Sequence, residues 1–265
     1  MSVKALILTA LILCMPVTAI GAEKADFVSG FAKGVGPDNN PLAFLSPGVK
    51  NICFTKDGEG ITDKAVLVAK GDFQAFGSVV DAVPSIASPL VYNDISALNP
   101  EEGTVEVWVK PGFSQVDKLA SGAYVYYVFD VWSFTRKDRD SNEEAKKLFP
   151  GGMQLLIYVS SVGDKILQAA CLQSDGTKVS LVSKPVEMEP HKWYHLAMVW
   201  SKDTLSIYLD GKKVASKGIS GPIKSLTSPM MFGASQSYTA YLHGLLDNIK
   251  IYRSAVYDKD FVPQK

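Results

Sequence analysis

The histidines are the first side chains to consider for acid–base or metal chemistry: His191, His195 and His243. His191 and His195 are four residues apart, which on a β-strand puts them on one face but about 13 Å from each other. One metal ion cannot bind both side chains across that distance. His195 alternates with Ala197 and Val199 in an apolar stretch, and this pattern predicts a hydrogen-bonded histidine in the core.

The carboxylates do not show the spacing of a local hydrolytic site. A glycosidase needs two carboxyl groups, and one strand can supply both when a few residues separate them on one face. Here Glu101 and Glu102 are adjacent, and Glu106 stands alone between valines. Asp138 and Asp140 lie in a charged segment, which favours a solvated loop. The sequence favours a protein that does not catalyse, although residues from separate strands could still form a glycosidase or lyase site.

Asp247 is a candidate metal ligand. Alternation along residues 245–251 predicts that Asp247 shares an apolar face with Ile249 and Ile251. A carboxylate on such a face costs on the order of a few kcal/mol unless a partner satisfies it. Two partners remain open, a structural calcium ion and a set of backbone N–H donors.

An aromatic strand at residues 123–132 provides a candidate binding surface. Strict alternation predicts one face that carries Tyr124, Tyr126, Asp130 and Trp132. Aromatic rings stack on the C–H faces of sugars, and a carboxylate bonds their hydroxyls. The loops around this strand complete the predicted ligand-binding set, which is Tyr124, Tyr126, Asp130, Trp132, Arg136, Tyr238 and Tyr241. The alternative is that Tyr124 and Tyr126 pack inside the protein.

The elements that must position these residues are strands. Strand patterns, either alternating or apolar on both faces, recur in many short segments, which are 104–110, 123–132, 153–161, 166–173, 179–182, 193–200, 205–209, 212–216 and 245–252. Asp210 and Gly211 supply the left-handed residues of a tight hairpin turn. Helical periodicity occurs only at 142–149. Many strands and few helices predict an all-β sandwich or barrel.

Three segments together resemble the laminin-G-like jelly-roll family of the concanavalin A-like superfamily. They are residues 99–111, residues 191–214 with their Trp/His strand and Asp-Gly-Lys hairpin, and the closing segment 243–252. In the closing segment, Asn248 stands where the family usually has a second acid. The resemblance implies a two-sheet antiparallel jelly-roll sandwich, and many family members are similar in carrying a structural Ca²⁺.

The N-terminus has the pattern of a secretory signal peptide. Lys4 precedes an apolar run at 5–15, and small residues at 18–22 suit cleavage. We therefore expect a signal peptide at 1–22, a single domain at 23–265 and a protein that is secreted, periplasmic or at the cell surface. No later apolar run is long enough for a transmembrane helix, since that takes about 20 residues.

Charge and cysteine content restrict the possible partners. The chain has 27 basic and 27 acidic residues, so the formal net charge is zero, and no basic stripe suggests binding to nucleic acid. Cys53 and Cys171 remain after signal cleavage. They could form a disulfide in an oxidising compartment or stay as buried thiols.

The leading hypothesis is an exported, non-catalytic recognition domain whose ligand is carbohydrate. It rests on the missing carboxylate pair, the exported fold and the aromatic strand. A protein-binding or adhesion module of the cell surface or matrix is the first alternative. A glycoside hydrolase or polysaccharide lyase with a non-local active site is the second.

Overall fold

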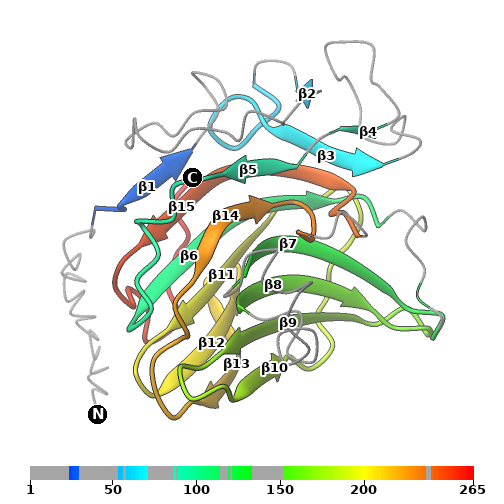
Figure 1. Ribbon diagram of the computed structural model, residues 1–265. Coiled ribbons are helices and arrows are strands. Elements are labelled where there is room, and N and C mark those ends of the chain that lie inside the picture. Colours follow the sequence, from blue (N-terminus) through cyan, green and yellow to red (C-terminus); the bar gives the residue numbers. More distant parts are fainter. Residues whose placement is uncertain are drawn as a thin grey trace, which may run out of the picture.

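The computed structural model describes residues 24–29, 53–55, 58–70, 86–87, 89–113, 119, 121–132, 152–236 and 240–265. The predicted signal peptide at 1–22, the segment at 142–149, Arg136 and Tyr238 lie outside these residues. Within them the regular elements are strands, and two antiparallel sheets pack as a sandwich (Figure 1), which confirms the all-β jelly-roll prediction. In the same part of the chain, no helix is long and apolar enough to cross a membrane.

Sheet A is the larger layer, with nine strands in the described part of the chain. Its main path runs through β13 (Lys212–Gly218), β12 (Thr204–Leu209), β11 (Tyr194–Trp200), β6 (Gly103–Pro111), β15 (Gly244–Tyr252), β3 (Val66–Lys70) and β2 (Cys53–Phe54). Off this path, β1 (Phe27–Ser29) pairs with β15, and β4 (Ile86–Ala87) pairs with β3. Strand β15 thus pairs with β1, β3 and β6, which come from three distant parts of the sequence.

Sheet B has six strands among the described residues and forms the second layer. Its order is β10 (Lys178–Val182), β9 (Lys165–Leu172), β8 (Gly152–Val159), β7 (Tyr124–Trp132), β14 (Thr227–Phe232) and β5 (Leu90–Tyr92). The aromatic strand singled out from the sequence is β7, which lies between β8 and β14.

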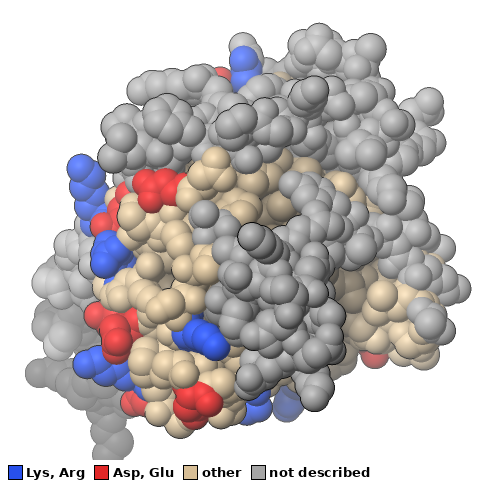
Figure 2. All heavy atoms as spheres, viewed as in Figure 1, with Lys and Arg blue, Asp and Glu red and all other residues tan. Residues whose placement is uncertain are grey.

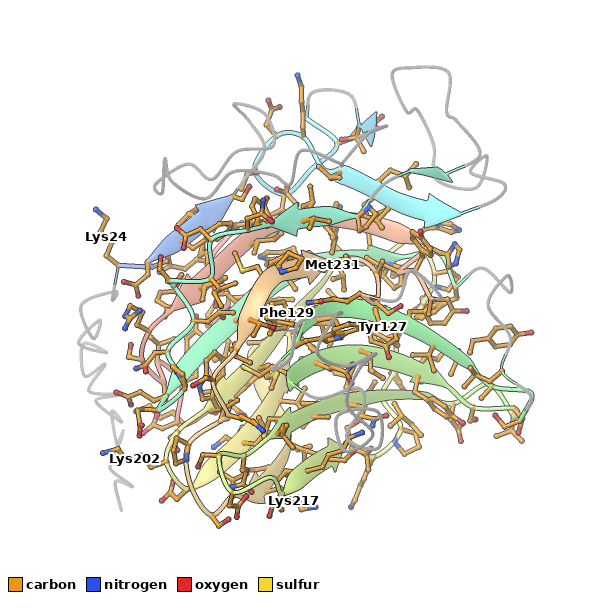
Figure 3. The ribbon with its side chains drawn as sticks, viewed as in Figure 1. Lys24, Tyr127, Phe129, Lys202, Lys217 and Met231 are labelled. Carbon is orange, nitrogen blue, oxygen red and sulfur yellow. The ribbon has the colours of Figure 1, made fainter. Side chains whose placement is uncertain are left out.

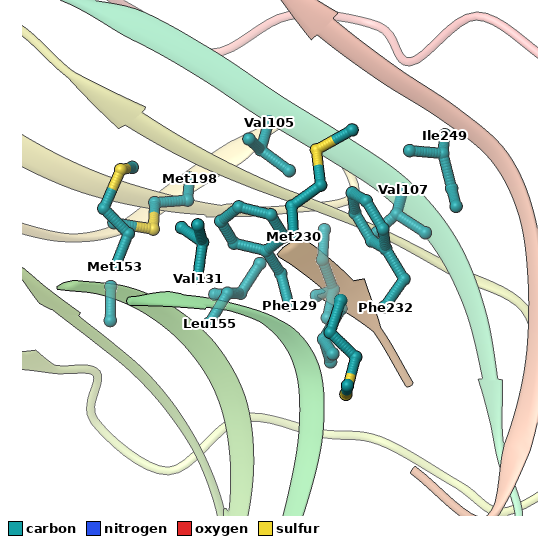
Figure 4. Close-up of a cluster of buried hydrophobic side chains, with 14 of the residues drawn as sticks. Val105, Val107, Phe129, Val131, Met153, Leu155, Met198, Met230, Phe232 and Ile249 are labelled. Atoms are coloured by element: carbon teal, nitrogen blue, oxygen red, sulfur yellow. The ribbon is translucent and has the colours of Figure 1, made fainter. Parts of the chain in front are cut away.

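The core fills the space between the two sheets. As predicted, Val105, Val107 and Val109 of β6 share a face, and all three are buried there. Sheet B contributes the apolar side chains seen in Figure 4, which include Phe129, Val131, Met153, Leu155, Met230 and Phe232. Burying one side chain of this size stabilises the fold by about 1.5–3 kcal/mol, so this layer contact is the main source of stability.

Trp200 is the largest fully buried side chain, and its packing depends on a glycine in the neighbouring strand. The indole Nε1 of Trp200 donates a hydrogen bond to the Asn99 carbonyl oxygen at 2.9 Å. Gly103 is the direct cross-strand partner of Trp200, and a Cβ at Gly103 would overlap the indole ring. The pairing of β6 with β11 therefore requires glycine at this position.

The predicted hairpin at Asp210 and Gly211 is confirmed. Both residues have left-handed backbone angles, with φ of 49° and 77°, and they join Leu209 to its cross-strand partner Lys212. This geometry matches the right-handed twist of the flanking strands.

Cys171 is a free, buried thiol, so it does not form the disulfide with Cys53 that was one of the two possibilities. The Cys171 side chain belongs to the apolar core, and burial raises the pKa of its thiol to about 11. The buried-thiol alternative therefore describes this residue.

Two β-bulges interrupt the alternation of side chains, one in β7 and one in β15. In β7 the pairing with β8 passes from Tyr127↔Leu156 to Phe129↔Leu155, which leaves Val128 as an extra residue. In β15 the pairing with β6 shifts after Asp247, where Asn248 has a left-handed φ of 46°. One extra residue moves every later side chain to the opposite face of the sheet.

Asp247 ties the closing strand to the loop at 58–65. Its Oδ2 accepts hydrogen bonds from the backbone N–H groups of Ile61 and Thr62 at 2.6 and 2.8 Å. Its Oδ1 accepts from the Thr62 hydroxyl at 2.9 Å and from the backbone N–H of Asn248 at 2.6 Å. Burial raises the pKa of the Asp247 carboxyl, and these hydrogen bonds oppose that change.

The prediction that Asp247 shares a face with Ile249 and Ile251 is wrong. Asp247 pairs with Trp108 on the face of sheet A turned away from the core, whereas Ile249 and Ile251 point into the core. The bulge at Asn248 separates them, because alternation holds only where the strand has no extra residue.

The close approach of Gly103 to Trp200 predicts the effect of adding one methyl group. We expect Gly103→Ala to lower the free energy of unfolding by about 1–3 kcal/mol, since the new Cβ forces the indole out of its place. Urea unfolding measures this change. Gly221→Ala is the matched control, because nothing lies within 4 Å of its Cβ position. Equal midpoints for both variants would contradict the packing argument.

The hydrogen bonds of Asp247 predict a structural role for its charge. We expect Asp247→Asn to lower the free energy of unfolding by about 2 kcal/mol or more, because an amide nitrogen then faces N–H donors. Asp203→Asn, at an exposed turn, serves as the control and should change the stability little. Melting curves with and without EDTA should coincide for the wild type, and a lower melting temperature in EDTA would instead support a bound calcium ion.

Candidate functional site

The bulge in β7 divides its aromatic side chains between two surfaces. Before the bulge, Tyr126 points into the core, where it is 1% exposed and its ring meets Phe113 edge to face at 5.6 Å. Tyr124 also packs against the core, with part of its side chain exposed. After the bulge, Phe129 and Val131 take the inward positions.

Tyr127, Asp130 and Trp132 consequently lie on the outer face of sheet B, the face turned away from the core (Tyr127 and Phe129 are labelled in Figure 3). The prediction that Tyr124 and Tyr126 share a face with Asp130 and Trp132 is therefore wrong. Unbroken alternation would put the four side chains on one face, but the extra residue reverses the faces in the second half of the strand.

Asp130 is the centre of a polar cluster on this outer face. Its Oδ2 accepts a hydrogen bond from the backbone N–H of Gln236 at 2.8 Å, and its Oδ1 accepts from Gln154 Nε2 at 3.2 Å. Gln154 is the direct cross-strand partner of Asp130 in β8. We name this set, with Tyr127 and Trp132, the Asp130 cluster. Its members come from β7, β8 and the segment after β14.

Burial controls the electrostatics of the Asp130 cluster. Asp130 is 1% exposed, and burial raises the pKa of its carboxyl to about 7, while hydrogen bonds from Gln236 and Gln154 act in the opposite direction. Burial and the nearby charge of Asp130 raise the pKa of Tyr127 to about 12, so the phenol keeps its proton at neutral pH. The cluster thus combines a hydroxyl donor with a carboxyl that changes charge near neutral pH.

The outer face of sheet B continues from this cluster toward the edge strand β10. Val125 pairs with Tyr158, and both side chains are half-buried. In β9, Gln168 is also half-buried, and its Nε2 donates a hydrogen bond to Ser180 Oγ at 3.1 Å. We name the partly exposed residues Tyr127, Tyr158, Gln168 and Ser180 the tyrosine–amide face. It offers two phenol rings, one amide and a serine hydroxyl at a partly exposed surface.

The remaining predicted ligand-binding residues have different outcomes. Tyr241 is buried and forms an isolated bridge with Ala234, which brings its segment next to Gln236. Its ring lies 6.1 Å from that of His243. Arg136 and Tyr238 are outside the described residues, so their roles stay predictions.

Three residues of this surface were not predicted from the sequence: Gln154, Gln236 and Gln168. Gln154 and Gln168 carried a detectable signal, because each is a polar residue at an outward position in an otherwise apolar strand. Gln236 carried no such signal, because it lies in a loop and its backbone N–H, not its side chain, donates to the Asp130 carboxylate.

A second polar cluster lies on the outer face of sheet A around Glu106. The Glu106 Oε2 atom accepts a hydrogen bond from the Tyr257 hydroxyl at 2.6 Å and lies 3.5 Å from His195 Nε2. Its Oε1 atom lies 3.5 Å from Lys250 Nζ and accepts from the Tyr252 hydroxyl at 3.4 Å. His195 is buried as predicted, with 1% exposure, but it lies on this outer face beside Phe261 of the C-terminal segment and not in the core between the sheets.

The residues around Asp247 do not fit a calcium site. Four N–H and O–H groups point their positive ends at its two oxygens, whereas a calcium ion needs several oxygen ligands. Among the residues that the structure describes, no group of three or more His, Cys, Asp or Glu side chains is placed to hold a metal ion. The comparison of melting curves with and without EDTA tests whether this protein binds calcium.

The surface charges of the described residues are mixed in sign. Figure 2 shows Lys and Arg side chains interspersed with Asp and Glu along one side of the molecule. On this face, the described residues form no broad patch of one charge.

Comparison with known proteins gives the same architecture. Among solved structures, the binding domain of botulinum neurotoxin serotype G aligns with a TM-score of 0.58 at 10% identity, over 88% of this chain and 49% of that chain. Domain 4 of AbnA, an extracellular arabinanase from Geobacillus stearothermophilus, was solved in complex with arabinotriose. It aligns with a TM-score of 0.55 at 13% identity, over 88% of this chain and 94% of that chain.

Tailspike protein 2 from an Escherichia coli bacteriophage aligns with a TM-score of 0.52 at 13% identity, over 80% of this chain and 26% of that chain. This chain thus spans about half of the neurotoxin domain and about a quarter of the tailspike. At these identities the likeness shows a shared fold. No curated protein matches the sequence at a significant level.

A family model gives a more direct assignment. The model described as the concanavalin A-like lectin/glucanases superfamily matches residues 87–260, which is more than half of the chain. The match covers β6 to β15, the strands that build most of both sheets and carry both polar clusters. By its sequence and by its two-layer architecture, the chain belongs to the concanavalin A-like lectin/glucanase superfamily.

Proposed function

We propose that this protein is an exported, non-catalytic recognition domain that binds carbohydrate at the tyrosine–amide face of sheet B. The observation that carries the proposal is the bulge at Val128, which turns Asp130 onto the face that also holds Tyr127, Tyr158 and Gln168. A sugar presents C–H groups that stack on aromatic rings and hydroxyls that bond amides. This face combines both kinds of partner over neighbouring strands.

The contacts of Asp130 favour binding over hydrolysis. A carboxyl with a pKa of about 7 has the acidity of a general acid, but glycosidase chemistry also needs a second carboxyl group close by. Among the residues that the structure describes, the Gln154 amide and the Gln236 backbone N–H donate hydrogen bonds to the Asp130 carboxylate. They hold Asp130 in place as a support beneath the tyrosine–amide face.

The solved structures support the proposal through the fold they share with this chain. The arabinanase domain was captured with arabinotriose, and this chain aligns with nearly its whole length. The same architecture therefore accommodates a saccharide in at least one relative. The choice of sheet B in this proposal rests on the residues named above and not on that similarity.

A glycan array followed by isothermal titration calorimetry tests the proposal. We expect an oligosaccharide to bind, and absence of binding at millimolar sugar concentration would overturn the proposal. Release of reducing sugar from a polysaccharide panel would indicate a glycosidase or lyase instead. Capture of an extracellular protein that sugars do not compete away would favour the adhesion alternative.

Substitutions on the tyrosine–amide face should weaken binding of the oligosaccharide that the array identifies. Tyr127→Leu and Tyr158→Leu each remove a ring, and Gln168→Ala removes an amide. We expect each to raise the Kd at least about fivefold, which corresponds to roughly 1 kcal/mol. Gln264→Ala is the matched control, because this glutamine lies against sheet A and its backbone carbonyl makes the contacts there. Unchanged affinity in all three variants would place the sugar elsewhere.

The raised pKa of Asp130 predicts how this residue affects stability. The pKa of about 7 in the folded protein exceeds the ordinary value of 3.8, so the folded state binds the proton more tightly than the unfolded state. Its contribution to stability is therefore largest in acid and is lost as the pH rises through about 7.

We expect Asp130→Asn to remove this dependence, so that the variant loses less stability than the wild type between about pH 4 and 8. Urea unfolding across that range measures the difference, and NMR titration of the Asp130 carboxyl measures its pKa directly. Parallel stability curves for the two proteins would contradict the electrostatic assignment.

A further inference from the structure

The C-terminal segment at 254–265, which we call the strap, lies across the outer face of sheet A and has a fixed root. The backbone N–H of Arg253 donates to Asp26 Oδ2 at 2.8 Å, and its guanidinium donates to the Ser96 carbonyl oxygen. The Arg253 carbonyl oxygen accepts from Asn99 Nδ2 at 2.9 Å. The chain is therefore anchored at Arg253, and the strap extends from that point.

Beyond its root, most hydrogen bonds that hold the strap involve a side chain, and few join main chain to main chain. The side-chain bonds come from Thr104, Trp108, Tyr208, Lys213, Asn248 and Asp260. The N–H of Val256 donates to Thr104 Oγ1 at 3.1 Å, and that of Phe261 donates to the Gly211 carbonyl oxygen at 2.8 Å. Gly211 permits this contact, because a Cβ there would overlap the Phe261 carbonyl. Segments with few main-chain bonds and partial exposure open at lower free energy than the strands of a sheet.

Two aromatic rings provide the apolar contact of the strap. Tyr257 and Phe261 stack with their ring centroids 3.5 Å apart and nearly parallel planes. They pack on Ala197, Val199 and Tyr208 of β11 and β12. The strap thus covers an apolar area beside the Glu106 cluster.

The Tyr257 hydroxyl makes the shortest contact of the strap with a buried charge, the 2.6 Å hydrogen bond to Glu106 Oε2. The groups that face Glu106 from the packed elements are His195 of β11, Lys250 and Tyr252 of β15, and Tyr257 of the strap. All are basic groups or hydroxyls. Neutralising Glu106 would leave a buried cluster with no negative charge to balance Lys250.

We propose that the strap is releasable, that the Tyr257–Glu106 hydrogen bond is its latch, and that protonation of Glu106 opens it while the sandwich stays folded. Release uncovers Trp108, His195 and Tyr208 together with Glu106 on the outer face of sheet A. This device lies on the opposite layer from the tyrosine–amide face, so it does not depend on the carbohydrate proposal.

The direction of the pH effect follows from the surroundings of Glu106. Burial raises the pKa of its carboxyl, but the hydrogen bond and charge of His195, the Tyr257 hydroxyl and Lys250 outweigh burial and lower that pKa below its ordinary value of 4.5. The stabilisation of the closed strap is therefore present above that value and is lost as the pH falls through the lower pKa of the folded state. Acid opens the strap.

Two tryptophan indoles make separate reporters for NMR. Trp108 Nε1 donates to the Gln264 carbonyl oxygen at 3.3 Å, so its signal reports on the strap. Trp200 Nε1 donates to Asn99 in the core, so its signal reports on the folded sandwich. On acidification we expect the Trp108 indole signal to move and the Trp200 signal to stay.

Variants at neutral pH separate the latch from general acid effects. Glu106→Gln imitates the protonated carboxyl, and Tyr257→Phe removes the latch hydroxyl without altering the sheet. We expect both to shift the Trp108 indole signal and to increase amide hydrogen exchange in the strap at least about tenfold, with β11 unchanged. Tyr252→Phe is the matched control, since it removes the other hydroxyl on Glu106 from a strand and should leave the strap closed.

Two results would overturn the proposal. One is simultaneous change of the Trp108 and Trp200 signals in acid and in Tyr257→Phe, which would mean that the strap leaves only when the sandwich unfolds. The other is an unchanged Trp108 signal in Tyr257→Phe, which would mean that the hydroxyl is not the latch. If Glu106→Gln fails to fold, Tyr257→Phe and the acid titration decide the question.

Discussion

The β-bulge in β7, where Val128 is one residue more than the paired strand β8 provides, decides which side chains lie on each face of sheet B. Without Val128 as the extra residue, Tyr127 would stay outside but Asp130 and Trp132 would turn into the core. Phe129 and Val131 would then leave the apolar layer. A carboxylate between the sheets would cost on the order of several kcal/mol, so the hydrophobic core and the Asp130 cluster require the same local irregularity.

The two polar clusters show how neighbouring groups set the charge of a buried acid. Asp130 is surrounded by neutral donors, and burial prevails, so its pKa rises to about 7. Glu106 is equally inaccessible, but His195 and Lys250 lie within 3.5 Å, and its pKa falls. Burial acts in the same direction on both residues. The two pKa values move in opposite directions because basic side chains lie on the strands next to Glu106, whereas neutral donors surround Asp130.

Much of the architecture was predictable from local pattern, and the site was predictable only in part. The valines of β6, the hairpin at Asp210 and the buried His195 follow from alternation and turn chemistry, which are properties of neighbouring residues. Asp130 and Trp132 were correctly placed on one strand, yet their companions Tyr124 and Tyr126 face the core. A bulge depends on how two strands pair, and a two-residue period in one strand carries no information about it. The same failure affected Asp247, where the irregularity at Asn248 lies within the closing strand.

The central place of β15 in sheet A has a consequence for how the chain folds. Strands β1 and β3 emerge early during synthesis, but both pair with β15, which is the last strand made. Until β15 is made, the backbone N–H and C=O groups of β1 and β3 that pair with it have no partner strand. The contacts that complete sheet A therefore join residues from nearly opposite ends of the sequence. Topologies dominated by such distant pairings fold slowly and expose strand edges while they wait. Sheet A is therefore completed only after almost the entire chain is available, and the early strands depend on being kept apart from other chains until that moment.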